Sequence, residues 1–99
     1  MRIEDQIGTV ELFRERLANG LEDVDQLQSR VNFAKYLAEH LAQMFRDASI
    51  SVTLTDKEGG TLRIYNEPED IELCEIETMI WEAKIELWGY SDEWLVRKP

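Results

Sequence analysis

The chain has 99 residues, 43% of them hydrophobic, and its 21 acidic and 11 basic residues give a net charge of −10. This length and apolar content fit one domain with a core of its own, and the acidity argues against free nucleic acid and anionic membranes as partners. The chain has a single cysteine and therefore no intramolecular disulfide. No apolar run follows the first residues, and no stretch approaches ~20 apolar residues, so we expect neither a signal peptide nor a membrane span. These features together lead us to expect a cytoplasmic protein.

Two helices are predicted in the first half of the chain. A helix over residues 3–18 is indicated by apolar residues at spacings of three and four, although Gly8 lies inside it: Ile3, Ile7, Val10, Phe13 and Leu17. A second helix, over residues 21–48, has a heptad-like seam: Val24, Leu27, Val31, Ala34, Ala38, Leu41 and Phe45. Such a seam fits packing within the chain or a homodimer, and both remain open.

The apolar period then changes from that of a helix to that of a strand. Residues 50–55 and 61–65 alternate apolar and polar side chains around a turn that contains Gly59 and Gly60, which predicts a two-stranded antiparallel hairpin over residues 50–65. One face of the hairpin should be apolar: Ile50, Val52, Leu54, Leu62 and Ile64. A hairpin of two strands is marginally stable alone, so we expect the helices to cover this face.

An acidic helix is predicted over residues 67–88, with Asn66 as its cap, Glu69 completing a capping box and Gly89 as its stop. It carries an apolar stripe of Leu73, Ile76, Ile80, Ala83 and Leu87, and a second one about 100° around the helix. The members of the second stripe are Cys74, Trp81, Ile85 and Trp88. A third stripe, named here the acidic stripe, contains Glu72, Glu75, Met79, Glu82 and Glu86.

The tail, residues 90–99, fits either a short helical turn capped by Ser91 or a third short strand through residues 94–96. The sequence therefore predicts an α+β protein with the order α-α-β-β-α, in a single domain over residues 1–99. Long helices would pack on the antiparallel hairpin.

The acid balance of the last third of the chain is its most informative feature. Ten carboxylates and one cation, Lys84, lie between Glu67 and Glu93. Carboxylates three or four residues apart on a helix lie roughly 5–6 Å from one another, a separation of the same order as that of phosphates along a nucleic-acid strand. A solvated helix face is the alternative, but such a face usually mixes charges of both signs.

The three tryptophans are the second candidate feature. We expect Trp81 in the core, and for Trp88 and Trp94 the sequence leaves core and interface open. The residues expected to contact a partner are Glu69, Glu72, Glu75, Glu82 and Glu86 as phosphate mimics, with Met79 and Trp88 as apolar anchors.

No residues are assigned to catalysis, a cofactor or a metal. His40 is the only histidine and Cys74 the only cysteine, so no zinc site is predicted. A serine or threonine nucleophile would need a base beside it, and His40 is the only imidazole available. The Gly59-Gly60 turn lacks the Lys-Ser/Thr that follows a phosphate-binding loop.

This small, acidic profile is similar in a general way to stoichiometric inhibitors such as phage anti-CRISPR proteins, restriction inhibitors and toxin-immunity proteins. That resemblance implies a protein that covers a basic nucleic-acid channel. Our leading expectation is an inhibitor that docks its acidic helix on a basic surface of a protein that binds DNA or RNA, without binding nucleic acid or membrane itself. The alternative is a structural or adaptor module that self-associates through the seam of the long helix.

Overall fold

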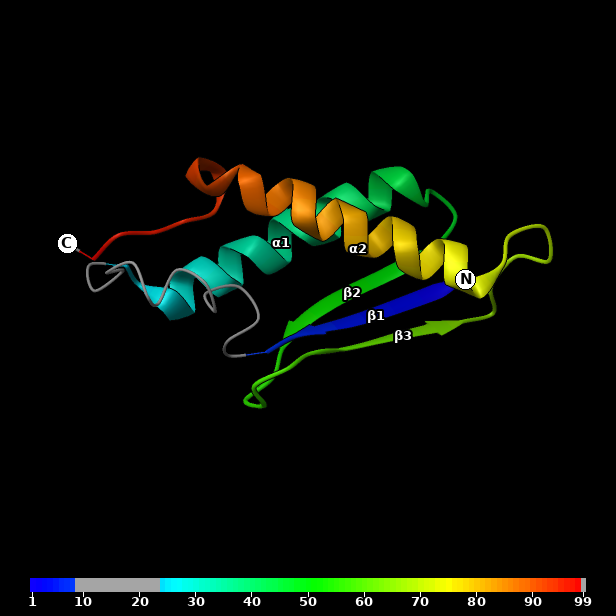
Figure 1. Cartoon of the computed structure of the whole chain (residues 1–99), viewed down its shortest axis with the longest axis horizontal. Coiled ribbons are helices and arrows are strands. Elements are labelled where there is room, and N and C mark those ends of the chain that lie inside the picture. The colour runs from blue at the N-terminus through cyan, green and yellow to red at the C-terminus, as the bar shows by residue number, and fades with distance from the viewer. Residues whose placement is uncertain (9–23, 99) are drawn as a thin grey trace.

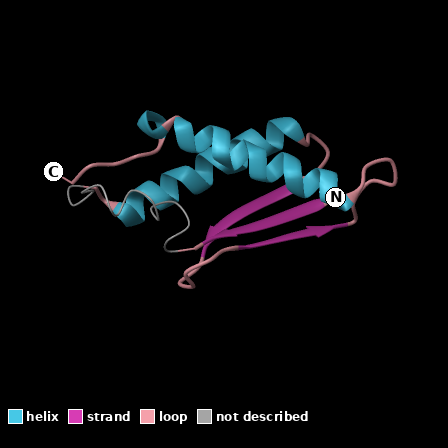
Figure 2. Cartoon of the chain, in the orientation of Figure 1, coloured by secondary structure: helices cyan, strands magenta, loops and turns pink. Residues whose placement is uncertain are grey.

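The computed structural model describes residues 1–8 and 24–98, and the fold is mixed α+β. The elements follow one another as β1 (Arg2–Ile7), α1 (Gln26–Met44), β2 (Ser49–Leu54), β3 (Thr61–Tyr65), α2 (Leu73–Gly89) and a 3-10 turn, η2 (Ser91–Glu93). Both long helices lie on the same side of a three-stranded sheet (Figures 1 and 2).

The sheet has the order β2-β1-β3, so the first strand lies in the middle. In β1, Ile3 is paired in parallel with Ile50 of β2 and in antiparallel with Ile64 of β3. The predicted hairpin over residues 50–65 is therefore wrong in its pairing, because β1 separates its two strands. A parallel pair needs a long crossover connection, and α1 lies in the connection between β1 and β2.

The helix predicted over residues 3–18 is wrong where the structure describes it, because residues 2–7 form β1. Ile3, Asp5 and Ile7 point inward and are buried, whereas Arg2 and Gln6 are exposed. This is the two-residue alternation of a strand. The alternation is not evident in the sequence, because the inward position of Asp5 holds a carboxylate where an apolar residue is expected. The remainder of that predicted helix, residues 9–18, lies outside the described residues.

Helix α1 is shorter than the predicted span of residues 21–48, of which residues 21–23 lie outside the described part. It begins after Asp25, whose carboxylate accepts a hydrogen bond of 3.0 Å from the backbone N–H of Gln28, as an N-cap does. Most of the heptad-like seam faces the protein's own core rather than solvent. Ala34, Leu41 and Phe45 are buried in it, while Leu27 remains exposed.

Strands β2 and β3 present one apolar face to the helices, as predicted. The inward residues pack against the core: Ile50, Val52, Leu54, Leu62 and Ile64. The opposite face of the sheet is polar and open to solvent, with exposed side chains at alternate positions: Ser49, Ser51, Thr53, Thr61 and Arg63. A face of this composition is typical of an antiparallel or mixed sheet that is covered on one side only.

Helix α2 starts later than the predicted residue 67, and its N-cap is Glu72 rather than Asn66. Asn66 instead adopts a left-handed backbone with φ of 55°, a conformation that asparagine tolerates better than most residues, and it follows the end of β3. A turn closed by a hydrogen bond from the Ile71 N–H to the Pro68 carbonyl then leads into the helix. The predicted capping box at Asn66 and Glu69 does not form for this reason.

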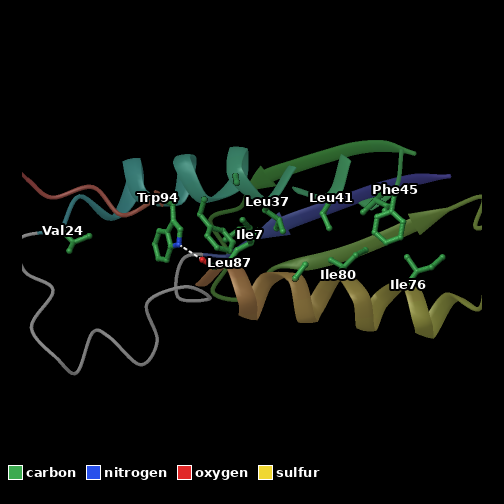
Figure 3. Close-up of a cluster of buried hydrophobic side chains, with 13 residues drawn as sticks. Ile7, Val24, Leu37, Leu41, Phe45, Ile76, Ile80, Leu87 and Trp94 are labelled. Carbon is green, nitrogen blue, oxygen red and sulfur yellow. Dashed lines mark hydrogen bonds between the residues drawn. The ribbon is translucent and has the colours of Figure 1, made fainter. Parts of the chain in front are cut away.

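The core lies between the sheet and the two helices, and Trp94 closes one end of it (Figure 3). The indole of Trp94 is fully buried, donates a 3.0 Å hydrogen bond from Nε1 to the Leu87 carbonyl, and meets the ring of Phe33 edge-on at 5.2 Å. Of the two positions that the sequence left open for Trp94, core and interface, the structure has the core. Burial of the ring with its N–H satisfied is the favourable arrangement for tryptophan.

The tail returns to the start of α1 after the 3-10 turn η2. Val96 donates its N–H to Ser29 Oγ at 2.8 Å and accepts the N–H of Asp25 at 2.8 Å. Val24 and Arg97 form an isolated antiparallel bridge, so the third strand suggested for residues 94–96 does not form as a strand. The short helical turn expected near Ser91 is present as η2.

Candidate functional site

Helix α2 buries one face and leaves the rest of its surface to solvent. Four residues of the predicted apolar stripe are buried, namely Ile76, Ile80, Ala83 and Leu87, whereas Leu73 at the start of the helix is 40% exposed. These buried residues set the rotation of α2 about its axis, and therefore decide which of its other side chains face outward.

A buried ion pair sets the same rotation. Lys84 extends from α2 to the middle strand, where its Nζ lies 2.9 Å from Oδ1 and 2.8 Å from Oδ2 of Asp5. The Asp5 side chain is completely buried and that of Lys84 is 19% exposed. Lys84 is the only basic residue of α2, so the pair places the one cation of this helix against the sheet rather than on the surface.

The acidic stripe faces solvent along α2. All four of its carboxylate residues, Glu72, Glu75, Glu82 and Glu86, are exposed, and Met79 between them is 39% exposed. Glu69 is also exposed but lies in the segment that precedes the helix. The structure therefore places the stripe on one continuous surface, with Glu69 beside the N-terminal end of the helix rather than on it.

The electrostatics of the stripe are unfavourable at the C-terminal end of the helix that carries it. Neither of the ion pairs seen in the described part of the chain, Arg2–Glu4 and Lys84–Asp5, uses a carboxylate of the stripe. Acids near the N-terminus of a helix interact well with its dipole, which suits Glu72 and Glu75. Glu86 lies in the last turn of α2, which has no basic residue, and there the dipole disfavours a negative charge.

A hollow of about 210 Å³ lies between α1 and α2 beside the acidic stripe. Its α2 side is formed by Met79, Glu82, Ala83 and Glu86, and its α1 side by His40 and Met44. Three of the residues expected to contact a partner thus line one depression, together with two residues of α1 that the sequence did not connect to them. His40 and Met44 reach it because α1 and α2 pack side by side.

The two tryptophans of α2 differ in exposure, and one of them lies elsewhere than the sequence predicted. The prediction of Trp81 in the core is wrong, because this side chain is 63% exposed. Trp88 is half-buried, with its ring centroid 6.1 Å from that of Trp94, so it lies at the edge of the core and apart from the acidic stripe. The reason is that α2 packs only through the face that carries Ile80 and Ala83, and Trp81 projects well away from that face.

The exposed apolar residues of α2 are the functional candidates that sequence reasoning missed. Trp81 and Ile85 are 63% and 53% exposed and lie one helical turn apart, with exposed Cys74 further toward the N-terminus. We call Cys74, Trp81 and Ile85 the apolar row. The second apolar stripe in the sequence contained these residues, and its position about 100° from the first was the available signal that it could not share the same buried face.

Among residues 1–8 and 24–98, no group of three or more His, Cys, Asp or Glu side chains is arranged to hold a metal ion. Over the same part of the chain, no helix combines the length and apolarity needed to cross a membrane. No protein-family model matches the chain, and no curated protein matches it significantly in sequence. The functional interpretation therefore depends on the exposed surface of α2, which combines the acidic stripe with the apolar row.

Proposed function

We propose that this protein is a non-catalytic inhibitor that acts in the cytoplasm by docking the acidic stripe of α2 on a basic surface of a protein that handles DNA or RNA. The observation that carries the proposal is the run of exposed carboxylates on one side of α2, from which the only cation of the helix is withdrawn. A surface of this kind attracts lysines and arginines over a long range and competes with a nucleic-acid backbone for them.

The cost of the stripe to the helix supports a role in recognition. Glu82 and Glu86 are one turn apart, where like charges repel, and Glu86 also opposes the helix dipole. Acids that alternate with bases along the helix would avoid this repulsion and gain favourable pairs one turn apart. Proteins commonly retain destabilising surface groups where function requires them.

Self-association through the seam of α1, the alternative function, could use only part of the seam. Ala34, Leu41 and Phe45 of the seam are buried in the protein's own core, and exposing them would disrupt it. The hollow between α1 and α2 favours the acidic stripe instead, because its apolar lining residues Met44, Met79 and Ala83 lie beside two carboxylates. The aliphatic stem and charged end of a lysine or arginine would suit such a depression.

The proposal is tested by capture from a lysate with the tagged protein at about 0.1 M and about 0.5 M salt. We expect a nucleic-acid-binding protein to be retained at low salt, released at high salt and displaced by an oligonucleotide. The triple variant Glu75→Lys, Glu82→Lys, Glu86→Lys should lose this capture and remain folded.

The matched control is Glu39→Lys, Asp47→Lys, Asp56→Lys, which changes the net charge equally at exposed acids away from α2. This control should retain most of the capture. If both triple variants lose it equally, total charge rather than the acidic stripe is responsible. If neither loses it, the acidic stripe is not the docking surface.

A further inference from the structure

The apolar row is a second feature of the exposed surface of α2, beside the acidic stripe. Trp81 and Ile85 are more than half exposed although they belong to a helix with a well-packed buried face. At about 1.5 Å per residue, the row from Cys74 to Ile85 extends roughly 16 Å along the helix. Exposed Thr78 lies between Cys74 and Trp81, so the continuous apolar part of the row is Trp81 and Ile85. Large aromatic and aliphatic side chains exposed together are typical of surfaces that bind another protein.

The packing of α2 shows which way the row points. Ala83 and Met79 line the hollow against α1, and Lys84 reaches β1 of the sheet. Trp81 and Ile85 project from the side of the helix that faces neither α1 nor the hollow. Their exposure shows that no described element covers them.

Carboxylates border the row on both sides. Glu77 lies one turn before Trp81 on the side of the helix nearer Lys84, whereas Glu82 and Glu86 of the acidic stripe lie on the other side. All three are exposed. Because Lys84 is held against Asp5, the row is an apolar strip between two negatively charged borders.

We propose that the apolar row binds an amphipathic helix of the partner protein, with an apolar stripe that packs on Trp81 and Ile85 and with lysines or arginines on both flanks. This inference rests on the proposed function and specifies the element that the acidic surface recognises. Helix-to-helix docking of an apolar stripe is a common mode of recognition, and the basic flanks match the two acidic borders.

Charge also decides against a second copy of this chain as the occupant. Two copies paired through the row would bring Glu77, Glu82 and Glu86 of each close to the same acids of the other. Like charges placed opposite each other in an interface oppose association. A basic helix would instead bring lysines or arginines close to these acids, so the interaction would be attractive.

The test uses a synthetic amphipathic peptide of about eighteen residues that contains leucine at helical spacing and lysine or arginine elsewhere, and no tryptophan. A scrambled peptide of the same composition has the same charge but no apolar stripe. Binding of each is measured by titration calorimetry and by tryptophan fluorescence. Because Trp94 is buried and Trp88 half-buried, a shift to shorter wavelength should come mainly from Trp81 when its ring is covered. We expect the amphipathic peptide to bind about tenfold or more tightly than the scrambled one.

Variants locate the binding on the surface. Trp81→Ala and Ile85→Ala should each weaken binding of the amphipathic peptide about tenfold, as central apolar contacts do. Leu27→Ala is the matched control, because Leu27 is 64% exposed but lies on α1, and it should leave the affinity unchanged. All three variants alter exposed side chains and should unfold like the unmodified protein.

Three results would overturn the inference. If both peptides bind equally and Trp81→Ala has no effect, the row does not dock a helix, although the acidic stripe can still bind a basic surface. If sedimentation shows a dimer that Trp81→Ala dissociates, the occupant is a second copy. If neither peptide binds at about 0.1 M salt, the acidic surface attracts no basic partner and the proposed function fails as well.

Discussion

Lys84 Nζ of α2 lies between the two carboxylate oxygens of Asp5 in the middle strand, at 2.9 and 2.8 Å. This contact joins residues from opposite ends of the chain across a mostly apolar core. It also connects the interior to the candidate site, because the cation it removes from the surface of α2 would otherwise lie near Glu77 and the apolar row.

Lys84→Met should destabilise the protein by about 3 kcal/mol, because it leaves the Asp5 carboxylate buried without its counter-charge. Urea denaturation measures this change. Lys35→Met, which removes an exposed lysine of α1, is the control and should change the free energy of unfolding much less. The double variant Asp5→Leu, Lys84→Met should recover part of the loss, since neither charge is then left unpaired. Equal effects of the two single lysine variants would contradict the importance of the pair.

Trp94→Ala should cost about 3–5 kcal/mol, because it opens a cavity beside Phe33 and removes the hydrogen bond to the Leu87 carbonyl. The matched variant Trp81→Ala removes the same side chain from an exposed position and should have a small effect on stability. Thermal or chemical denaturation of the two proteins, side by side, checks the difference. Similar losses in both would mean that Trp81 is covered in solution.

Gly8→Ala should destabilise the protein by about 1–3 kcal/mol through overpacking. A Cβ at Gly8 would clash with the carbonyl oxygen of Glu58, so the end of β1 and the β2–β3 turn would have to move apart. At Gly59, in that same turn, a Cβ would meet nothing within 4 Å, which makes Gly59→Ala the control. A Gly8→Ala protein with an unchanged melting temperature would contradict this close approach of the two backbones.

Glu86→Gln should raise the melting temperature of the protein, because it removes a negative charge from the end of α2 that the dipole disfavours and from repulsion with Glu82. Glu75→Gln, near the start of the same helix, should give a smaller gain or a loss. The difference between the two variants should shrink at about 0.5 M salt if it is electrostatic. The reverse order of melting temperatures would show that the position of the charge along the helix does not matter.

The sequence predicted the apolar faces of β2, β3 and α2 well, because each repeats at the period of its element. Val52 and Ile64 face the core as expected, and so do Ile80 and Leu87. These residues satisfy a local rule that does not depend on which elements become neighbours.

The sheet order could not be predicted, because it depends on one residue that breaks the local rule. Asp5 occupies an inward position of β1 and finds its partner in Lys84, far away in the sequence. With Asp5 counted as polar, Ile3 and Ile7 appeared one helical turn apart and the segment resembled a helix. If residues 2–7 are taken as helical, the strands over residues 50–55 and 61–65 have only each other to pair with.

The candidate site was predicted in part. The periodicity placed Met79, Glu82 and Glu86 on one side of α2, where the structure has them on one exposed surface. Which apolar stripe is buried depends on the packing of α2 against α1 and the sheet. The exposure of Trp81 therefore could not be predicted from the sequence of α2 alone. The contribution of His40 to the hollow likewise depends on the contact between two helices.

The central position of β1 has a consequence for how the chain reaches its native state. Ile3 pairs with Ile50 and Ile64, while β2 and β3, consecutive in the sequence, do not pair with each other. The sheet therefore assembles only by closing long loops, which slows folding relative to a protein built from local hairpins. Until β1 inserts, both of its partners present unsatisfied edges, and the β1 strand of a neighbouring molecule can occupy the gap and yield a domain-swapped dimer.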